Sequence, residues 1–223
     1  MSTEAPTPRT RVRRLPELGV YERDALNQIL DEALICYVAY TAEDGDPRVI
    51  PTIHARVGDT LYFHGSRASQ TLRALRDGAN LAVTATIIDG IRFARSMFEH
   101  SMNYRSVVAY GSPTEVTDLD ELRTVFRAIT NHVAPGRGED ARMPTDDELR
   151  QTLFLKIPLD EASAKVSSGQ ATDIDDDYAL DIWAGIMPLH TVPGEPISDP
   201  LLKAGVPTPD YITGWKRPGA SDA

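Results

Sequence analysis

The sequence predicts a mainly β protein with α-helices, built as an antiparallel barrel with flanking helices. About six short runs rich in β-branched and aromatic residues are bounded by Gly, Pro, Asn and Asp turn signals. Only two longer segments with helical periodicity lie between these runs. A parallel sheet would need a helix after nearly every strand, so the pattern favours an antiparallel barrel over a βαβ sheet.

The chain begins with an expected arm and a helix. Residues 1–19 hold three prolines and a cluster of arginines, which predicts an extended arm. Over residues 22–33, apolar side chains recur with the i, i+3, i+4, i+7 spacing of a helix. These apolar positions are Leu26, Ile29, Leu30 and Ala33.

A three-stranded meander is expected next. Residues 34–41 (LICYVAYT) are rich in β-forming residues, and the Glu43–Asp46 turn joins them to a second strand over 47–56. A tight turn at 57–59 then leads to a third strand over 60–64.

The middle of the chain adds a helix over 69–77 and strands over 81–89 and 105–111. Gly90 is expected to break the first of these strands. Residues 114–117 are expected to join the same sheet as their neighbours.

The barrel is expected to end with a long helix, a short helix and a last strand. Residues 118–133 carry an apolar face and begin with acidic residues, as a helix N-terminus favours. A short helix over 146–151 precedes residues 153–157 (LFLKI), the expected final strand.

These boundaries predict one barrel domain over residues 20–160, between the arm (1–19) and a C-terminal extension (161–223). The last fifty residues are rich in proline and acidic residues, with Trp183 and Trp215 as expected anchors on the barrel or on a partner subunit.

Composition narrows the function. The chain has 223 residues with 23 basic and 33 acidic side chains, a formal charge of −10, which argues against general nucleic-acid binding. The single cysteine, Cys36, is expected to be a buried thiol in a reducing compartment. No apolar leader and no apolar run of membrane-spanning length are visible, so a soluble, cytoplasmic protein that contacts no membrane is expected.

Several familiar sites are missing from the sequence. The histidines lack the spacing of a zinc-binding helix, and a structural zinc site needs more than one cysteine. The acidic run 173–177 lacks the glycine and the final glutamate of a calcium-binding loop, so a solvated loop is expected there. No nucleophile elbow, dinucleotide fingerprint or P-loop occurs. We therefore expect no metal site.

The loop before the helix at 69–77 has the chemistry of a phosphate site. Free backbone N–H groups at a helix start attract anions, and Ser66 and Ser69 add hydroxyl donors while Arg67 adds a cation. The alternative is an ordinary serine cap on a surface helix.

A second polar cluster, 100–106, leads into the apolar run 107–110. Together with Arg92 and Arg95, Arg105 concentrates positive charge in an otherwise acidic chain. An anionic ligand would explain this concentration, and so would internal salt bridges.

Several stretches resemble the pyridoxamine 5′-phosphate oxidase-like superfamily, and within it the flavin-nucleotide-binding group related to nitroimidazole-resistance reductases. The resemblance is carried by DEALICYVAY, EDGDPRVIPTIHARVGDTLYFHGS, SRASQTLRAL and HSMNYRSVVAYG, with EASAKVSSG and WAGIMPL further on. It extends over roughly residues 11–190.

This resemblance implies an FMN-binding split β-barrel, an antiparallel Greek-key barrel, that forms a homodimer with FMN clefts at the subunit interface. Residues implied at the isoalloxazine ring are Arg48, Val49, Ile50, Pro51 and Thr52. Those implied at the ribityl-phosphate end are His64, Gly65, Ser66, Arg67 and Ser69. Those implied to complete the pocket, from the partner subunit, are Asn103, Tyr104, Arg105 and Ser106. Arg67-Ala68 replaces the Arg-Lys pair of the true oxidase, which argues against pyridoxamine phosphate oxidation.

The implied function is that of an FMN-dependent oxidoreductase acting on a small organic substrate by hydride or electron transfer. His64 is the side chain expected nearest the substrate, as a proton donor, as a nucleophile, or simply as a hydrogen-bonding group. Alternatives are a non-enzymatic flavin-binding module, a deazaflavin protein, and a haem-binding split barrel with His54, His64 or His100 as axial ligand.

Overall fold

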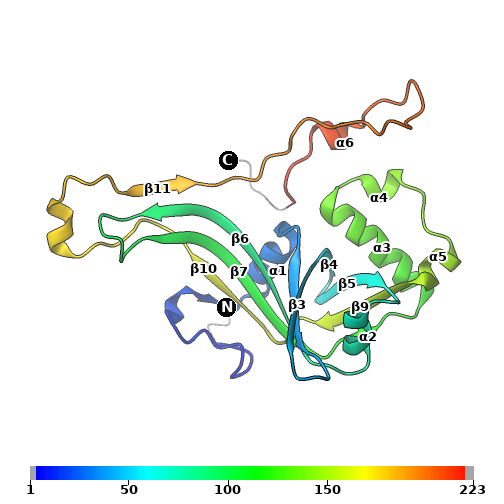
Figure 1. Cartoon of the computed structure of the whole chain (residues 1–223), viewed down its shortest axis with the longest axis horizontal. Helices are drawn as coiled ribbons and strands as arrows, with labels where there is room; N and C mark the ends of the chain where they lie inside the picture. The colour runs from blue at the N-terminus through cyan, green and yellow to red at the C-terminus, as the bar shows by residue number, and fades with distance from the viewer. Residues whose placement is uncertain (1–3, 219–223) are drawn as a thin grey trace.

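Two antiparallel sheets form the body of the protein (Figure 1). The computed structural model describes residues 4–218. The first three residues of the expected N-terminal arm (1–3) and the last five of the expected C-terminal extension (219–223) therefore lie outside the described residues. The larger sheet has the order β1 (Gly19–Val20), β10 (Ala162–Ser167), β7 (Ser101–Gly111), β6 (Leu81–Phe93), β2 (Cys36–Thr41), β3 (Pro47–Thr52), with β11 (Gly185–Pro188) paired to β6. The smaller sheet has the order β4 (His54–Val57), β5 (Thr60–Ser66), β9 (Thr152–Pro158), β8 (Thr114–Glu115). The expected split barrel with flanking helices is confirmed.

The chain passes from one sheet to the other at Ile53. The single strand expected over 47–56 is therefore wrong: β3 pairs with β2 in the larger sheet, and β4 pairs with β5 in the smaller one. Pro51 explains part of the division, because it has no N–H for a second ladder and β3 lies at the sheet edge.

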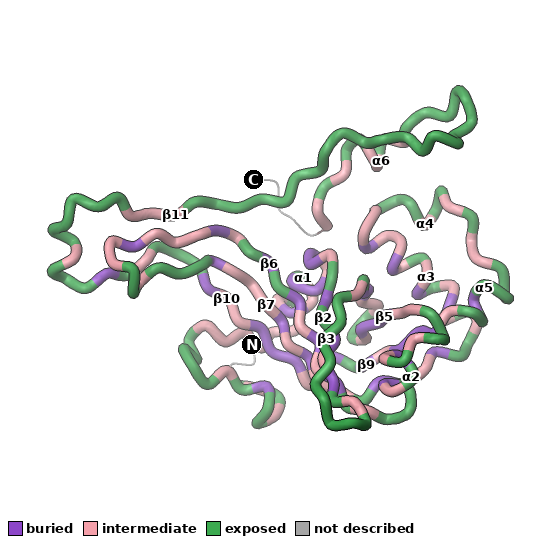
Figure 2. The backbone as a smooth tube through the Cα atoms, viewed as in Figure 1, coloured by how far each residue is buried: buried purple, intermediate pink, exposed green. Residues whose placement is uncertain are grey.

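Helices α1 (Arg23–Glu32) and α2 (Gln70–Arg76) pack apolar side chains against the main core. Figure 2 shows this core as the buried centre of the tube. Cys36 lies within it, fully buried, and desolvation raises the pKa of its thiol to about 12. The expectation of a buried core thiol is confirmed.

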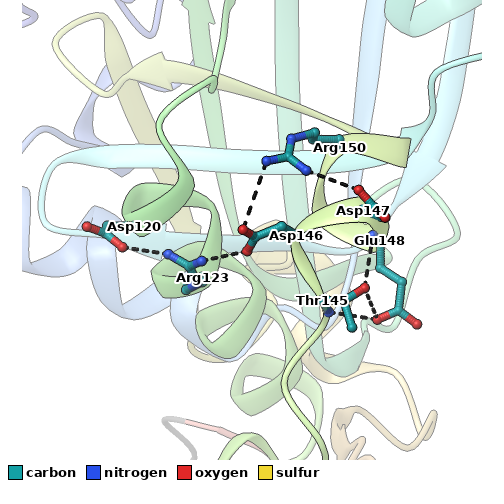
Figure 3. Close-up of polar contacts among 7 residues, drawn as sticks. All are labelled: Asp120, Arg123, Thr145, Asp146, Asp147, Glu148 and Arg150. Atoms are coloured by element: carbon teal, nitrogen blue, oxygen red, sulfur yellow. Dashed lines mark hydrogen bonds and ion pairs between the residues drawn. The ribbon is translucent and has the colours of Figure 1, made fainter.

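A second, smaller core lies beneath α3 (Leu119–Val133) and α5 (Asp146–Gln151). Figure 3 shows the polar contacts above it: Arg123 donates to Asp120 (2.7 Å) and to Asp146 (2.6 Å). The Thr145 hydroxyl and the Glu148 carboxylate form a reciprocal capping box at the start of α5. Exposed ion pairs contribute little, so the fully buried Leu149 is the main anchor of α5.

Two other helical turns flank the body. α4 (Arg137–Asp140) follows the end of α3, and η1 (Pro16–Leu18) precedes β1. Arg9 of the arm forms an ion pair with Glu161 and lies over the Tyr110 ring, so the arm contacts the barrel.

Gly90 does not break β6. The strand continues to Phe93 through a register shift between Ile88 and Gly90. A Cβ at Gly90 would lie 2.9 Å from the Met187 carbonyl, so the missing side chain lets β11 approach the bulge.

Two other strand expectations are wrong. Residues 114–115 form β8 in the smaller sheet, where they pair with β9 and not with β7. β9 is not the last strand, because β10 lies between β1 and β7 and β11 follows later. The boundary expected at residue 160 thus leaves a sheet strand in the extension; the division into arm, domain and extension otherwise stays a prediction.

Beyond the barrel, the far ends of β6 and β7 project together with β11 as a second arm, called the β6–β7 arm and distinct from the N-terminal arm (Figure 1). η2 (Asp175–Ala179) lies near its tip. Beyond β11 the chain is exposed until α6 (Asp210–Thr213). Trp215 Nε1 then donates to the Val133 carbonyl at 2.9 Å, so this tryptophan anchors the extension on α3. Trp183 lies against Phe93 on the arm and remains 69% exposed.

Candidate functional site

A pocket of about 230 Å³ opens where the two sheets separate. β2, β3, β5 and α2 all contribute to its wall. The lining residues are Val38, Ile50, Pro51, Thr52, Phe63, His64, Gly65, Ser66, Ser69, Thr71, Leu72 and Leu75. Aliphatic side chains and one aromatic ring form one part of the wall, and hydroxyl groups form the other.

The pocket joins two stretches that are separate in the sequence. β3 supplies the segment 50–52, while β5 and the loop after it supply the segment 64–66 and Ser69. Seven of the sequence-predicted site residues therefore share one cavity: Ile50, Pro51, Thr52, His64, Gly65, Ser66 and Ser69.

The serines of the loop are held by backbone groups but keep donor capacity. Ser69 caps α2 by accepting from the Leu72 N–H at 3.4 Å, and the Ser66 hydroxyl accepts from the Ala68 N–H at 3.1 Å. A hydroxyl that accepts a hydrogen bond still has its own O–H to donate. Because α2 has only seven residues, these side chains matter more here than a helix dipole.

The ring of His64 packs against the second core, on Phe126 and Phe154. Its ring stacks on Phe154, with centroids 5.1 Å apart, and its buried Nδ1 has no hydrogen-bond partner among the described residues. Burial lowers the pKa of His64, so the imidazole is neutral near pH 7.

Three other predicted residues lie near the pocket without lining it. Arg48 donates to Asp44 at 2.8 Å on the exposed hairpin, and Val49 faces solvent. Arg67 donates to the Arg150 carbonyl at 2.5 Å and forms an ion pair with Glu115 at 2.7 Å. Both guanidinium groups therefore have carboxylate partners within the chain.

The stretch 103–106 lies in β7 and does not line this pocket. Arg105 donates to Asp89 (2.9 and 2.7 Å) and to both carboxylate oxygens of Glu32. Asp89 and then Glu32 raise the pKa of Arg105. For this arginine, the internal salt bridge is therefore found.

The remaining members of that stretch have varied surroundings. Asn103 is buried, and its Oδ1 has no partner among the described residues. Ser106 donates to the Lys165 carbonyl at 3.4 Å, and Tyr104 is half-buried. Nothing in one copy of the chain brings these side chains to the pocket.

Sequence reasoning missed several lining residues, among them Val38 and Thr71. Thr71 accepts a hydrogen bond from the Tyr40 hydroxyl at 3.1 Å. The apolar periodicity of α2 marks Leu72 and Leu75 as inward-facing, but only the packing of the two sheets shows that they meet β3.

Other features carry less chemistry. A larger hollow of about 890 Å³ lies within the curl of the N-terminal arm, but its wall comes from one short segment, so we place the site in the smaller pocket between the sheets. Asp173, expected in a solvated loop, is instead buried and accepts from Arg95 at 2.8 and 3.1 Å. Within residues 4–218, no three His, Cys, Asp or Glu side chains are grouped to hold a metal ion, and no helix is both long and apolar enough to span a membrane.

A family model described as pyridoxamine 5′-phosphate oxidase matches residues 22–166. The chain belongs to this family. The relationship expected from the sequence is confirmed, although no curated protein matches the chain significantly.

Solved structures of family relatives extend the comparison. The flavocytochrome Anf3 from Azotobacter vinelandii is 32% identical, with a TM-score of 0.88 over 96% of this chain and 99% of that one. An FAD and haem binding protein from Mycobacterium smegmatis is 38% identical, with a TM-score of 0.85 over 92% of this chain and 100% of that one. A putative 5-nitroimidazole antibiotic resistance protein from Bacteroides thetaiotaomicron is 24% identical, with a TM-score of 0.57 over 66% of this chain and 86% of that one, and shares the fold.

Proposed function

We propose that this protein binds a flavin nucleotide in the pocket between the sheets and acts as a flavin-dependent oxidoreductase on a small organic substrate. The observation that carries the proposal is the meeting of residues 50–52 with residues 64–66 and Ser69 in one cavity. Family membership and the two relatives above 30% identity support a flavin as the ligand.

The chemistry of the wall fits a flavin. Val38 and Leu72 offer apolar surface for an aromatic ring system, while the hydroxyls of Ser66, Ser69 and Thr71 suit a ribityl chain and a phosphate. Since the wall contains no Lys or Arg, hydroxyl and backbone N–H groups would hold the phosphate.

The flavin is FMN or FAD, and the same pocket serves either because FAD contains the FMN unit. The sequence resemblance favours FMN, and the mycobacterial relative is described as binding FAD. At about 230 Å³ the pocket is smaller than a typical ligand site, so it would enclose only part of either molecule.

We propose that a second copy of the chain completes the site. β3 lies at the sheet edge and leaves Val49 64% exposed, and Ile35 and Tyr37 are exposed beside it. An apolar edge of this kind favours coverage by another chain. In the homodimer, the stretch 103–106 of the partner would complete the pocket.

A bound flavin would supply hydride and single-electron transfer. The chain's own residues would orient it: the backbone of residues 50–52 would lie along the ring and exclude water. His64, which burial keeps neutral, would carry one proton on its own imidazole ring at the edge of the pocket.

A haem is proposed as a second cofactor. The two relatives above 30% identity are described as a flavocytochrome and as an FAD and haem binding protein, and each aligns over nearly its whole length. When bound, a haem would supply single-electron chemistry.

Titration of the flavin-free protein with FMN and with FAD, followed by flavin fluorescence, tests the binding proposal. We expect saturable quenching by at least one of them, and absence of binding for both would refute the pocket as a flavin site. Turnover with NADH or NADPH and a panel of acceptors tests the enzymatic proposal. A flavin-loaded protein that turns over no acceptor would indicate a binding module instead.

A further inference from the structure

The tip of the β6–β7 arm exposes a group of large apolar side chains. Met97 and Phe98 lie between β6 and β7 and are 96% and 91% exposed. Trp183 comes from the C-terminal segment and packs on Phe93, with ring centroids 5.6 Å apart. Clustered exposure of this kind marks a surface that a ligand or a partner covers.

His100 stands beside this apolar surface with one nitrogen fixed and the other unused. Its Nδ1 lies 2.7 Å from the Ser96 carbonyl oxygen. Its ring stands nearly perpendicular to the ring of Phe93, with the two centroids 5.9 Å apart. A carbonyl can only accept, so Nδ1 carries the proton in a neutral ring and Nε2 keeps its lone pair. Metal-binding histidines use this arrangement: a carbonyl holds one nitrogen and orients the other toward the metal.

The other histidines of the described chain are less suited to bind iron. Nε2 of His54 and of His132 donates to the Leu30 and Ala33 carbonyls, and His54 is fully buried. His64 lines the pocket proposed for the flavin. His190 is exposed beyond β11 and lacks a hydrogen bond that would orient its ring.

An unpaired cation, Arg92, lies next to Phe93 in β6. Arg92 pairs with Ser101 of β7 and with Ile186 of β11. Among residues 4–218 its side chain has no hydrogen bond or ion pair, and its Nε is buried without a partner. Arg95, in contrast, is held by Asp173. An unpaired guanidinium in a protein of net charge −10 is suited to a carboxylate of a ligand.

We propose that the arm tip is a haem site, with His100 Nε2 as an axial ligand of the iron. Phe93, Phe98 and Trp183 would pack on the porphyrin, and Arg92 would pair with a propionate. This inference rests on the proposed function for the presence of a haem, and it assigns the haem to residues remote from the flavin pocket.

Titration of the haem-free, flavin-loaded protein with hemin tests the assignment, with the Soret band as the measure of haem and the flavin band read in the same samples. We expect His100→Ala to lose the histidine-ligated spectrum and to weaken hemin binding at least tenfold. Imidazole added to His100→Gly should restore the spectrum, which a merely structural role would not produce. Arg92→Ala should weaken hemin binding severalfold while the band position is unchanged.

His190→Ala is the matched control, because it removes another exposed histidine and should titrate as the unaltered protein does. The proposal is overturned if His100→Ala keeps the unaltered Soret band, or if His190→Ala loses it instead. Flavin content separates the two proposals: a protein that holds flavin but takes up no hemin refutes the haem site alone. A protein that holds neither refutes the proposed function as well.

Discussion

β6 and β7 run through two different environments, and their two ends show different uses of the same strands. Within the barrel, side chains of both strands enter the main core, and Arg105 is enclosed by two carboxylates. Along the arm, Phe98 is exposed, Arg92 has no partner among the described residues, and His100 has a free nitrogen. The barrel end satisfies its polar groups internally, whereas the arm end leaves groups that a ligand can use.

The largest expected effect separates the two arginines of these strands. Arg105→Ala would leave the buried Glu32 carboxylate without its main partner, and breaking a buried ion pair costs about 3 kcal/mol or more. Arg92→Ala should change the free energy of unfolding by less than ~0.5 kcal/mol. Urea unfolding measures both. Equal destabilisation by the two substitutions would mean that the arm is as tightly integrated as the barrel.

The buried His54 should make the free energy of unfolding depend on pH. Desolvation, and then the charge of His132, lowers the pKa of His54 to about 4, so the folded protein keeps this ring neutral. Between pH 6.5 and 4 the unfolded chain binds a proton that the folded chain excludes, so the free energy of unfolding falls as the pH is lowered, by about 3 kcal/mol from this group.

Unfolding measured at a series of pH values checks this expectation. His54→Gln keeps a donor for the Leu30 carbonyl and should flatten the slope over this range. A slope unaffected by His54→Gln would assign the acid sensitivity to other groups, including His132, whose pKa is also lowered by burial.

Two neighbouring residues of the loop at the flavin pocket, Ser66 and Arg67, should differ in their effect on flavin affinity. Ser66→Ala should weaken flavin binding by about 1 kcal/mol, roughly fivefold, because it removes a hydroxyl from the wall. Arg67→Ala should change the flavin affinity less than twofold, because this side chain is directed to Glu115 and Arg150. Fluorescence titration measures both. The reverse order would show that Arg67 turns into the pocket when the flavin binds.

The smallest expected effect concerns the anchor of the C-terminal segment. Trp215→Phe keeps most of the ring but removes the hydrogen bond to the Val133 carbonyl, a loss of about 1 kcal/mol. Hydrogen exchange should then rise around α6 while β6 and β7 in the barrel remain protected. If protection in the barrel falls equally, the segment is part of the cooperative core.

The sequence predicts well where local chemistry decides. Helix α5 has its expected bounds, and α2 begins directly after its Ser69 cap, because capping signals act over a few residues. The split at Ile53 and the sheet positions of β8 and β10 depend on pairing between distant strands, which alternation alone cannot assign.

The candidate sites follow the same rule. Turn and cap chemistry in the sequence identifies Ser66 and Ser69 as candidate site residues. Val38 and Thr71 line the pocket only because the two sheets pack together, which the sequence does not show. Arg105 remains ambiguous in the sequence, since both a ligand and a salt bridge, the commoner of the two, would explain it. Its partner Glu32 lies 73 residues away, and only the fold shows the contact.

The most direct test of the account is the visible absorption spectrum of the purified protein, with the released chromophores identified by mass. We expect a flavin band together with a Soret band, and FMN or FAD plus haem among the released molecules. A colourless protein that takes up neither added flavin nor hemin would contradict both the pocket between the sheets and the arm tip as cofactor sites.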